Sequence, residues 1–325
     1  MMKFKFIDLF AGIGGIRLGF EYYGGECVFS SEWDSFAQDT YEANFYERPT
    51  GDITKINPDE IPEHDILLGG FPCQAFSICG NQKGFSDTRG TLFFNIEEIL
   101  RIKSPYAFML ENVKNLNSHD KGRTFKIITQ HLEDLGYFVH HTILNSLGFG
   151  VPQKRERTII VGFKDNIQFS FPKPTGIKPD LADVLEDDER IEQQYFVSEE
   201  IRKKRFEKVK PNYPIPSIWH ENKSGNISAL EYSCALRAGA SYNYLVVNGI
   251  RRPTPRELLR LQGFPDSFKI VVPYTQIRKQ VGNSVAVPVI KAVAGEMLKS
   301  ISNKKQTIPS LKQLEIWVQP ECQLM

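Results

Sequence analysis

The segment Phe6-Ile7-Asp8-Leu9-Phe10-Ala11-Gly12-Ile13-Gly14-Gly15 places an apolar run directly before a glycine-rich turn. The apolar run predicts a buried strand over residues 4–10, and the helical spacing that follows predicts a helix over 14–23. Glycines let a ligand approach the backbone, and the free amides at a helix N-terminus favour anionic groups. A strand, a glycine turn and a helix in this order are typical of the first unit of a nucleotide-binding α/β sheet.

The alternation of strands and helices continues along the first half of the chain. Further strands are predicted over residues 27–31, 64–69, 106–110, 137–144 and 158–163, with helices over 35–44 and 121–135. Strands that alternate with helices indicate a parallel, doubly wound sheet. We therefore predict an α/β fold with a Rossmann-like sheet.

The sequence changes in character near Pro172, where Pro, Tyr, Asn and Ser become frequent. Beyond a helix predicted over 198–209 no clean period returns until Thr254, after which helices are predicted over 255–262 and 285–300. We expect residues 1–180 to form the main domain and residues 181–254 a small second domain. Residues 255–282 would then form a hinge region, and 283–325 would return to the main domain and end in a tail beyond Asn303.

The composition excludes several classes of protein. The chain has 325 residues, with 40 Lys and Arg against 39 Asp and Glu and 41% hydrophobic residues, which excludes an intrinsically disordered protein. Its 5 cysteines are scattered without a Cys-x-x-Cys pair, so neither a disulfide scaffold nor a metal site is predicted. No run approaches the roughly 18 consecutive apolar residues that span a bilayer. We expect a cytoplasmic protein that does not contact a membrane.

The near-neutral total charge conceals a basic segment. Residues 202–256 hold 11 Lys and Arg and 3 Glu, a net charge of +8, which leaves −7 for the rest of the chain. A basic segment inside a neutral protein indicates a polyanion-binding face. At least half of this charge is also explained by a solvated helix surface around Arg202-Lys203-Lys204-Arg205.

The residues that follow the first strands have the chemistry of an adenosine-type cofactor site. The second strand ends at Glu32, 20 residues after Gly12, where a carboxylate can accept hydrogen bonds from ribose hydroxyls. Trp33 beside it can cover an adenine face, and Asp52 is predicted to end a third strand. Because Arg17 occupies the third glycine position of the dinucleotide pattern, these residues leave both NAD and S-adenosylmethionine open.

The next two strand ends bring a cysteine and a carboxyl group to the same edge of the sheet. One strand leads into Gly70-Phe71-Pro72-Cys73-Gln74, and the following strand ends at Glu111-Asn112-Val113. A hydride-transfer enzyme has no use for a pair such as Cys73 and Glu111. An enzyme that activates an aromatic ring carbon needs both a nucleophile and an acid.

With these residues in place, the sequence resembles the bacterial C5-cytosine DNA methyltransferases, and most of all the HhaI-type modification methyltransferases. The resemblance covers about residues 4–298 and rests on six motifs in the family's order. They are Phe6–Gly15, Gly70–Ser77, Glu111-Asn112-Val113, Gln153-Lys154-Arg155-Glu156-Arg157, Arg252–Asp266 with Gln262-Gly263-Phe264-Pro265, and Gln280–Val285 with Gly282-Asn283-Ser284.

The resemblance implies a catalytic role for the residues of these motifs. Cys73, within the Pro-Cys-Gln core that includes Gln74, would attack C6 of a flipped cytosine, so that C5 can take the methyl group of S-adenosylmethionine and leave S-adenosylhomocysteine. Glu111 would supply a proton or hydrogen bond to N3. Arg155 and Arg157 would orient the base and hold Cys73 and Glu111 in place. The sequence does not name the base that removes the C5 proton.

The resemblance also implies two sets of binding residues. Those assigned to the cofactor are Phe10, Gly12, Gly14, Glu32, Trp33, Asp52, Ile53, Pro72, Leu92 and Asn283. Those assigned to DNA are Ser77, Cys79, Lys83 and Arg89 in a loop that closes over DNA in relatives, and Arg237, Tyr242 and Arg251 in the small domain, which would be the target-recognition domain. Lys203 and Lys204 are expected to contact phosphates. The implied partners are double-stranded DNA and a functionally paired restriction endonuclease, and we expect a monomer.

Three alternatives remain open at this point. A tRNA cytosine-5 methyltransferase carries the same motif set, although the compact, distinct second domain argues against it. A non-catalytic DNA-binding relative would not need Cys73, Glu111 and Arg155 together. A nicotinamide oxidoreductase is the most distant alternative.

Overall fold

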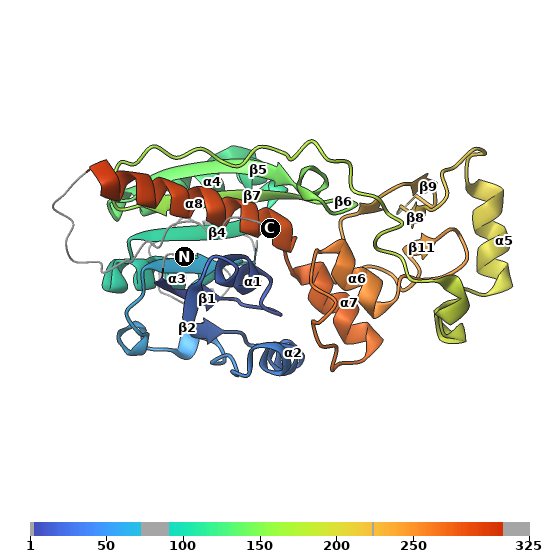
Figure 1. Cartoon of the computed structure of the whole chain (residues 1–325), viewed down its shortest axis with the longest axis horizontal. Helices are drawn as coiled ribbons and strands as arrows, with labels where there is room; N and C mark the ends of the chain where they lie inside the picture. Colours follow the sequence, from blue (N-terminus) through green and yellow to red (C-terminus); the bar gives the residue numbers. More distant parts are fainter. Residues whose placement is uncertain (1–2, 73–90, 223, 308–325) are drawn as a thin grey trace, which may run out of the picture.

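A computed structural model describes residues 3–72, 91–222 and 224–307 of the protein (Figure 1). A large lobe holds a six-stranded sheet, and a small lobe at the other end of the elongated molecule holds a three-stranded sheet. Helices α6 (Pro255–Leu261) and α7 (Tyr274–Asn283) lie between the two lobes.

The large sheet has the strand order β2-β1-β3-β4-β7-β5. Its strands are β1 (Phe4–Leu9), β2 (Gly25–Ser31), β3 (Ile66–Gly69), β4 (Ala107–Val113), β5 (Phe138–Asn145) and β7 (Glu156–Phe163). The pairs from β2 to β4 are parallel, but β7 runs antiparallel to both of its neighbours. The predicted α/β fold is confirmed, and the prediction of a wholly parallel sheet is wrong at β7. Side chains alternate with period two in either chain direction, so the sequence pattern did not reveal the reversal.

Two apolar layers cover the faces of this sheet. Alternating side chains of β1 serve both, since Phe6 belongs to one layer and Ile7 to the other. Helices α1 (Gly15–Glu21) and α8 (Val287–Thr307) pack on the face with Phe6, and α3 (Thr91–Lys103) and α4 (Arg123–Asp134) on the face with Ile7.

By length and composition the stretch Tyr274–Lys304 could cross a membrane, but 61% of its apolar window is buried inside the protein. Packing against the sheet accounts for that apolar character.

The structure adds two helices to the predicted ones and removes one strand. Helices α3 and α7 were not predicted, whereas α2 (Ser35–Phe45) and α5 (Glu199–Lys208) lie within one residue of their predicted bounds. Asp52 does not end a strand. It begins the short 3-10 helix Ile53–Lys55, and its carboxylate Oδ1 accepts a hydrogen bond from the Thr54 amide at 3.0 Å.

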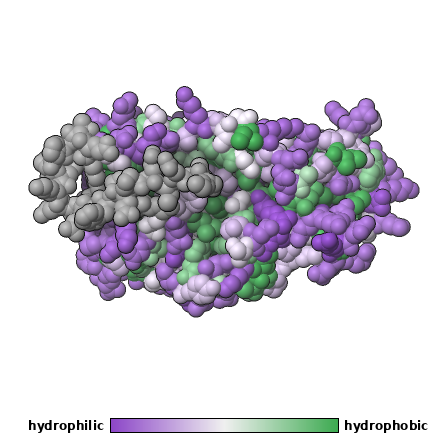
Figure 2. Space-filling model, viewed as in Figure 1, coloured by the Kyte–Doolittle hydropathy of each residue, from purple (hydrophilic) through white to green (hydrophobic). Residues whose placement is uncertain are grey.

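The small lobe has a core of its own. Strands β8 (Ile218–Glu221), β9 (Ile227–Leu230) and β11 (Leu245–Val247) form an antiparallel sheet with β8 in the middle. Trp219 on β8 is fully buried, and its ring centroid lies 4.7 Å from that of Phe206 on α5. Polar side chains cover most of the visible face of the molecule, including the end formed by the small lobe (Figure 2).

Asp8 on β1 is a fully buried carboxyl group, and neither of its oxygens has a hydrogen-bond partner among the residues that the structure describes. Burial raises the pKa of this carboxyl well above its ordinary value, against the opposing effect of the Arg17 guanidinium. The folded protein therefore binds this proton more tightly than the unfolded chain, and stability must fall as pH rises above the ordinary range of Asp.

The substitution Asp8→Asn tests this charge, because it keeps the shape of the side chain and removes the cost of ionisation. We expect the thermal midpoint of the variant to match that of the wild type below about pH 4 and to exceed it increasingly at higher pH. Thermal unfolding followed by circular dichroism from pH 4 to pH 8 measures the difference. Asp59→Asn, at an exposed position, is the control without a pH trend. A variant destabilised equally at every pH would contradict the expectation.

Candidate active site

A cavity of about 930 Å³ lies at the carboxyl ends of the parallel strands and is bounded by residues of α7. Its volume falls within the range of small-molecule sites, and its position is where open α/β sheets bind ligands. Nine of the ten residues predicted to hold the cofactor line this cavity: Phe10, Gly12, Glu32, Trp33, Asp52, Ile53, Pro72, Leu92 and Asn283.

The glycine turn after β1 fixes the carboxylate of Glu32. Gly12 has a φ of 55°, and its amide donates to Glu32 Oε2 at 2.9 Å. The amide of Asp34 donates to Oε1 at 2.8 Å. Burial raises the pKa of Glu32, although these two amides favour its charged form. The carboxylate is therefore held in place by the backbone, with its remaining lone pairs available to donors in the cavity.

Gly14 differs from the prediction, because it does not line the cavity. A Cβ at this position would lie 2.2 Å from the ring of Phe45, and the φ of Gly14 is +81°. Glycine is thus required here by the close approach of α2 and by the left-handed backbone. Its place in the motif comes from packing at the start of α1.

Trp33 and Asp52 present further groups to the cavity. The Trp33 side chain is 80% exposed at the cavity rim, so one face of its ring is open to a planar ligand. Asp52 uses Oδ1 for the amide and the hydroxyl of Thr54, at 3.0 and 2.8 Å. Its other oxygen, Oδ2, accepts no hydrogen bond from the described residues.

Several residues of the cavity wall were not predicted from the sequence. Asn95 lines the cavity, and its Oδ1 is buried without a partner among the described residues. Leu92 and Asn95 are three residues apart on α3, so prediction of this helix would have placed both on one face. Lys279 on α7 also lines the cavity and forms an ion pair with Asp34 at 2.5 Å.

Glu111 and Arg157 form the polar centre at the other side of the cavity. They lie on the adjacent strands β4 and β7, and Arg157 Nε is 2.8 Å from Glu111 Oε1. Burial raises the pKa of the Glu111 carboxyl, while Arg157 and Arg155 oppose that shift. A raised pKa makes the protonated form of this carboxyl more accessible, and that form can donate to a ring nitrogen.

Residues 70–72, the last ones described before position 73, line the cavity together with Glu111. Asn112 Nδ2 donates to the carbonyl of Phe71 at 2.9 Å and ties the end of β3 to β4. A Cβ at Gly70 would lie 3.7 Å from Glu111 Oε2, so glycine leaves the space in front of the carboxyl open. Six predicted site residues lie outside the described part of the chain: Cys73, Gln74, Ser77, Cys79, Lys83 and Arg89.

Arg155 lines the cavity and also joins the two lobes. It is buried, and it donates to the carbonyl of Leu236 at 3.0 Å and to those of Gly282 and Ser284. The resemblance implied that Arg155 orients the base and holds Cys73 and Glu111. Its observed hydrogen bonds connect the small lobe to the end of α7.

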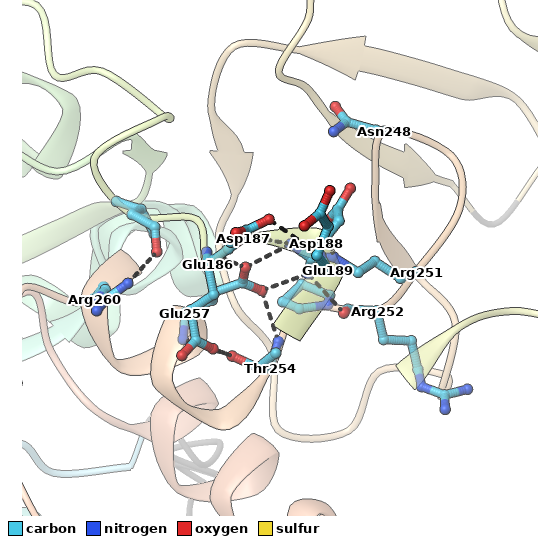
Figure 3. A network of polar contacts seen from close by, with 12 residues as sticks. Glu186, Asp187, Asp188, Glu189, Asn248, Arg251, Arg252, Thr254, Glu257 and Arg260 are labelled. Carbon is cyan, nitrogen blue, oxygen red and sulfur yellow. Dashed lines mark hydrogen bonds and ion pairs between the residues drawn. The ribbon is translucent and has the colours of Figure 1, made fainter. Parts of the chain in front are cut away.

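Arg251 was predicted to contact DNA, and the structure contradicts this. The side chain is fully buried and forms a bidentate pair with Glu257, with both N–O distances 2.8 Å (Figure 3). Its Nε lies 2.5 Å from Asp188 Oδ1. Glu257 in turn accepts from the Thr254 amide at the start of α6. Arg251 therefore fastens the small lobe to α6 and has no free donor for a base pair.

Some of the remaining basic residues of the small lobe form ion pairs with carboxylates, and others are exposed. On α5, Lys204 pairs with Glu200 at 2.6 Å, and the buried Arg205 pairs with Glu221 at 3.0 Å. These pairs neutralise part of the predicted basic face. Arg237 and Tyr242 are both exposed, in a segment whose Leu236 contacts Arg155.

Comparison with known proteins shows the family to which the chain belongs. The model of the C-5 cytosine-specific DNA methylases matches residues 4–299. The chain is 60% identical over 316 residues to the type II methyltransferase M.HaeII of Haemophilus aegyptius, which covers 97% of this chain and 99% of the relative. It is 61% identical to the type II methyltransferase M.NgoBI of Neisseria gonorrhoeae, over 93% of this chain and 96% of the relative.

A solved structure agrees on the fold. The Dnmt2 methyltransferase of S. pombe superposes with a TM-score of 0.73 at 18% identity, over 92% of this chain and 99% of that one. The resemblance drawn from six ordered motifs is confirmed by the family match. The chain belongs to the C-5 cytosine-specific DNA methylase family and is a DNA (cytosine-5)-methyltransferase.

Proposed function

We propose that the protein transfers a methyl group from S-adenosylmethionine to C5 of a cytosine flipped out of a short duplex site, as the modification enzyme of a type II restriction–modification system. The observation that carries the proposal is the buried Glu111–Arg157 pair, which lines the cofactor-sized cavity together with Pro72. A cytoplasmic location and a functionally paired restriction endonuclease belong to the same proposal.

The cavity fits the proposed methyl donor. Glu32 can accept hydrogen bonds from ribose hydroxyls, and the open ring of Trp33 can cover an adenine. The free oxygen of Asp52 and the buried Oδ1 of Asn95 add acceptors for amino groups. When bound, S-adenosylmethionine supplies an electrophilic methyl group on a sulfonium centre. The protein's own task is to hold it beside the target ring.

The other end of the cavity would receive the target base. Attack of the Cys73 thiolate at C6 breaks the aromaticity and places electron density on N3, where the Glu111 carboxyl would donate a proton or hydrogen bond. Arg157 contacts Glu111 and so fixes the direction of that donation. C5 then becomes nucleophilic enough to accept the methyl group. Loss of the C5 proton to a base that the sequence does not name, with expulsion of the Cys73 thiolate from C6, would restore the aromatic ring and free the enzyme. Because C6 is inaccessible in a stacked duplex, the cytosine must leave the helix first.

The alternative substrate is a tRNA, and a direct competition separates the two. The purified full chain is incubated with labelled S-adenosylmethionine and either a duplex pool or a tRNA pool, and methyl incorporation is counted. Incorporation into duplex DNA alone supports the proposal. Incorporation into tRNA alone would overturn it in favour of the tRNA methyltransferase.

Glu111→Gln tests the acid role. The amide keeps the shape of the side chain but has no carboxyl proton to donate, so the methyl-transfer rate should fall by about 10²–10⁴-fold. The affinity for S-adenosylhomocysteine, measured by calorimetry, should stay within a factor of two. Glu98→Gln, an exposed position on α3, is the matched control.

The pH profile provides a second readout of the same group. Since burial raises the pKa of Glu111, the wild-type rate should decline as pH rises through that raised pKa, where the carboxyl loses its proton. The residual activity of Glu111→Gln should lack this decline. An unchanged profile in the variant would exclude Glu111 as the titrating acid.

Cys73→Ala tests the covalent step. A duplex with 5-fluorocytosine at the target should trap the wild-type enzyme in the presence of S-adenosylmethionine, because fluorine at C5 cannot leave as a proton does. The adduct should survive denaturation on a gel. Cys27→Ala should form it, and Cys73→Ala should not. An adduct with Cys73→Ala would assign the nucleophile to another residue.

A further inference from the structure

A cluster of arginine and tyrosine side chains lies where the small lobe meets α7. The Tyr242 ring is contacted by two guanidinium groups, Arg252 at 4.5 Å and Arg278 at 4.9 Å from its centroid. The ring of Tyr274 lies 5.6 Å from that of Tyr242 at an interplanar angle of 84°. Tyr242 is nevertheless 45% exposed, so its outer edge is available to a partner.

No carboxylate of the described residues compensates the positive charge of this cluster. Among the residues that the structure describes, neither Arg252, Arg278 nor the neighbouring Arg237 lies within ion-pair distance of a carboxylate. Arg251 and Arg205 of the same lobe are both ion-paired. Uncompensated guanidinium groups around an exposed aromatic ring favour a polyanionic partner that also presents planar groups.

Arg278 fixes the backbone that carries Tyr242. Its Nη2 donates to the carbonyl of Ser241 at 2.8 Å and to that of Ala240 at 3.3 Å. Asn243, on the other side of Tyr242, accepts from Arg252 Nη1 at 3.2 Å through its Oδ1. The residues on both sides of Tyr242 are therefore held by the same arginines that contact its ring.

The cluster lies next to the candidate active site through α7. Lys279 and Gly282 of this helix line the cofactor cavity. A Cβ at Gly282 would lie 2.2 Å from the amide nitrogen of Ala238, which shows how closely α7 approaches the backbone of the recognition segment 236–244. The exposed edge of Tyr242 thus belongs to a segment that contacts the wall of the site where the flipped base would be bound.

We propose that Tyr242 is a specificity-determining contact to a base pair of the duplex, and that Arg278 is the residue that positions it. The proposal rests on the proposed function, and it adds the residues that discriminate between sequences. Tyr242 presents a ring edge and a hydroxyl to the groove, while Arg252 and Arg278 keep the ring in one orientation. Loss of Arg278 releases both the ring and its backbone.

The test uses the full-length enzyme and a pool of duplexes with randomised positions around a cytosine. Sequencing of the products after chemical conversion of unmethylated cytosine gives the preferred site of the wild type. Single-turnover rates are then measured on that site and on each duplex with one base pair changed. The variants are Tyr242→Leu, Arg278→Gln, their combination and Arg278→Lys.

We expect Tyr242→Leu and Arg278→Gln to lower the discrimination ratio about tenfold at the same one or two base pairs and to leave the other positions unchanged. The combined variant should lose no more than either single one, because both act through one contact. Arg278→Lys should keep the salt dependence of DNA binding but not the discrimination, since lysine lacks the planar fork. S-adenosylhomocysteine affinity should remain at its wild-type value.

Arg202→Gln is the matched control, because Arg202 is an exposed arginine on α5 that stacks on Phe206 at 5.7 Å and has no part in the cluster. It should change no discrimination ratio.

A uniform loss of rate on all duplexes in Tyr242→Leu and Arg278→Gln would overturn the proposal, and so would losses at different positions that add up in the combined variant. If the wild type methylates no duplex at all, the proposed function fails. If it methylates with a preference that the variants retain, only this inference fails.

Discussion

The extended segment that includes Gln153, Arg155 and Arg157 holds the two lobes and the candidate active site in one arrangement. Alternate residues of an extended chain point in the same direction, and all three contact groups around the site. Gln153 donates to the carbonyl of Leu261 at 2.8 Å and accepts from the Leu236 amide at 3.0 Å. Arg155 donates to the carbonyl of the same Leu236. Arg157 contacts Glu111. One segment therefore sets the position of the small lobe and the orientation of the acid.

Burial of the Arg155 guanidinium is costly unless its N–H groups are satisfied. The carbonyls of Leu236, Gly282 and Ser284 accept hydrogen bonds from its two terminal nitrogens, whereas Nε has no partner among the described residues. These carbonyls belong to the small lobe and to the end of α7. Burial and the nearby Arg157 lower the pKa of Arg155 to about 9, so the group remains charged at neutral pH. A charged donor shared between distant segments gives the junction a single geometry, because any displacement leaves a buried polar group without a partner.

Glu32 and Glu111 are two buried carboxyl groups at the same edge of the sheet, but they have different partners. Glu32 is held by two backbone amides, which direct it to accept hydrogen bonds from a ligand. Glu111 is held by a guanidinium on the neighbouring strand, in a pocket that raises its pKa. Both pKa values are raised by burial, but Glu111 lies beside Gly70, at the start of the Gly-Phe-Pro segment. Their different surroundings suit Glu32 to binding a ligand and Glu111 to acting as an acid.

The sequence by itself determined the α/β class, the glycine turn, and the positions of Glu32 and Glu111 at one sheet edge, because local periodicity and strand ends are encoded by neighbouring residues. Tertiary structure decided the rest. The reversal of β7 is invisible to a pattern that reads the same in both directions. The identity of Arg251 does not reveal its burial, since one of its two carboxylate partners, Asp188, is 63 residues away in the chain. Likewise, the basic segment does not show which arginines are neutralised and which, like Arg278, remain free of a carboxylate, because ion pairing depends on which distant segments the fold brings together.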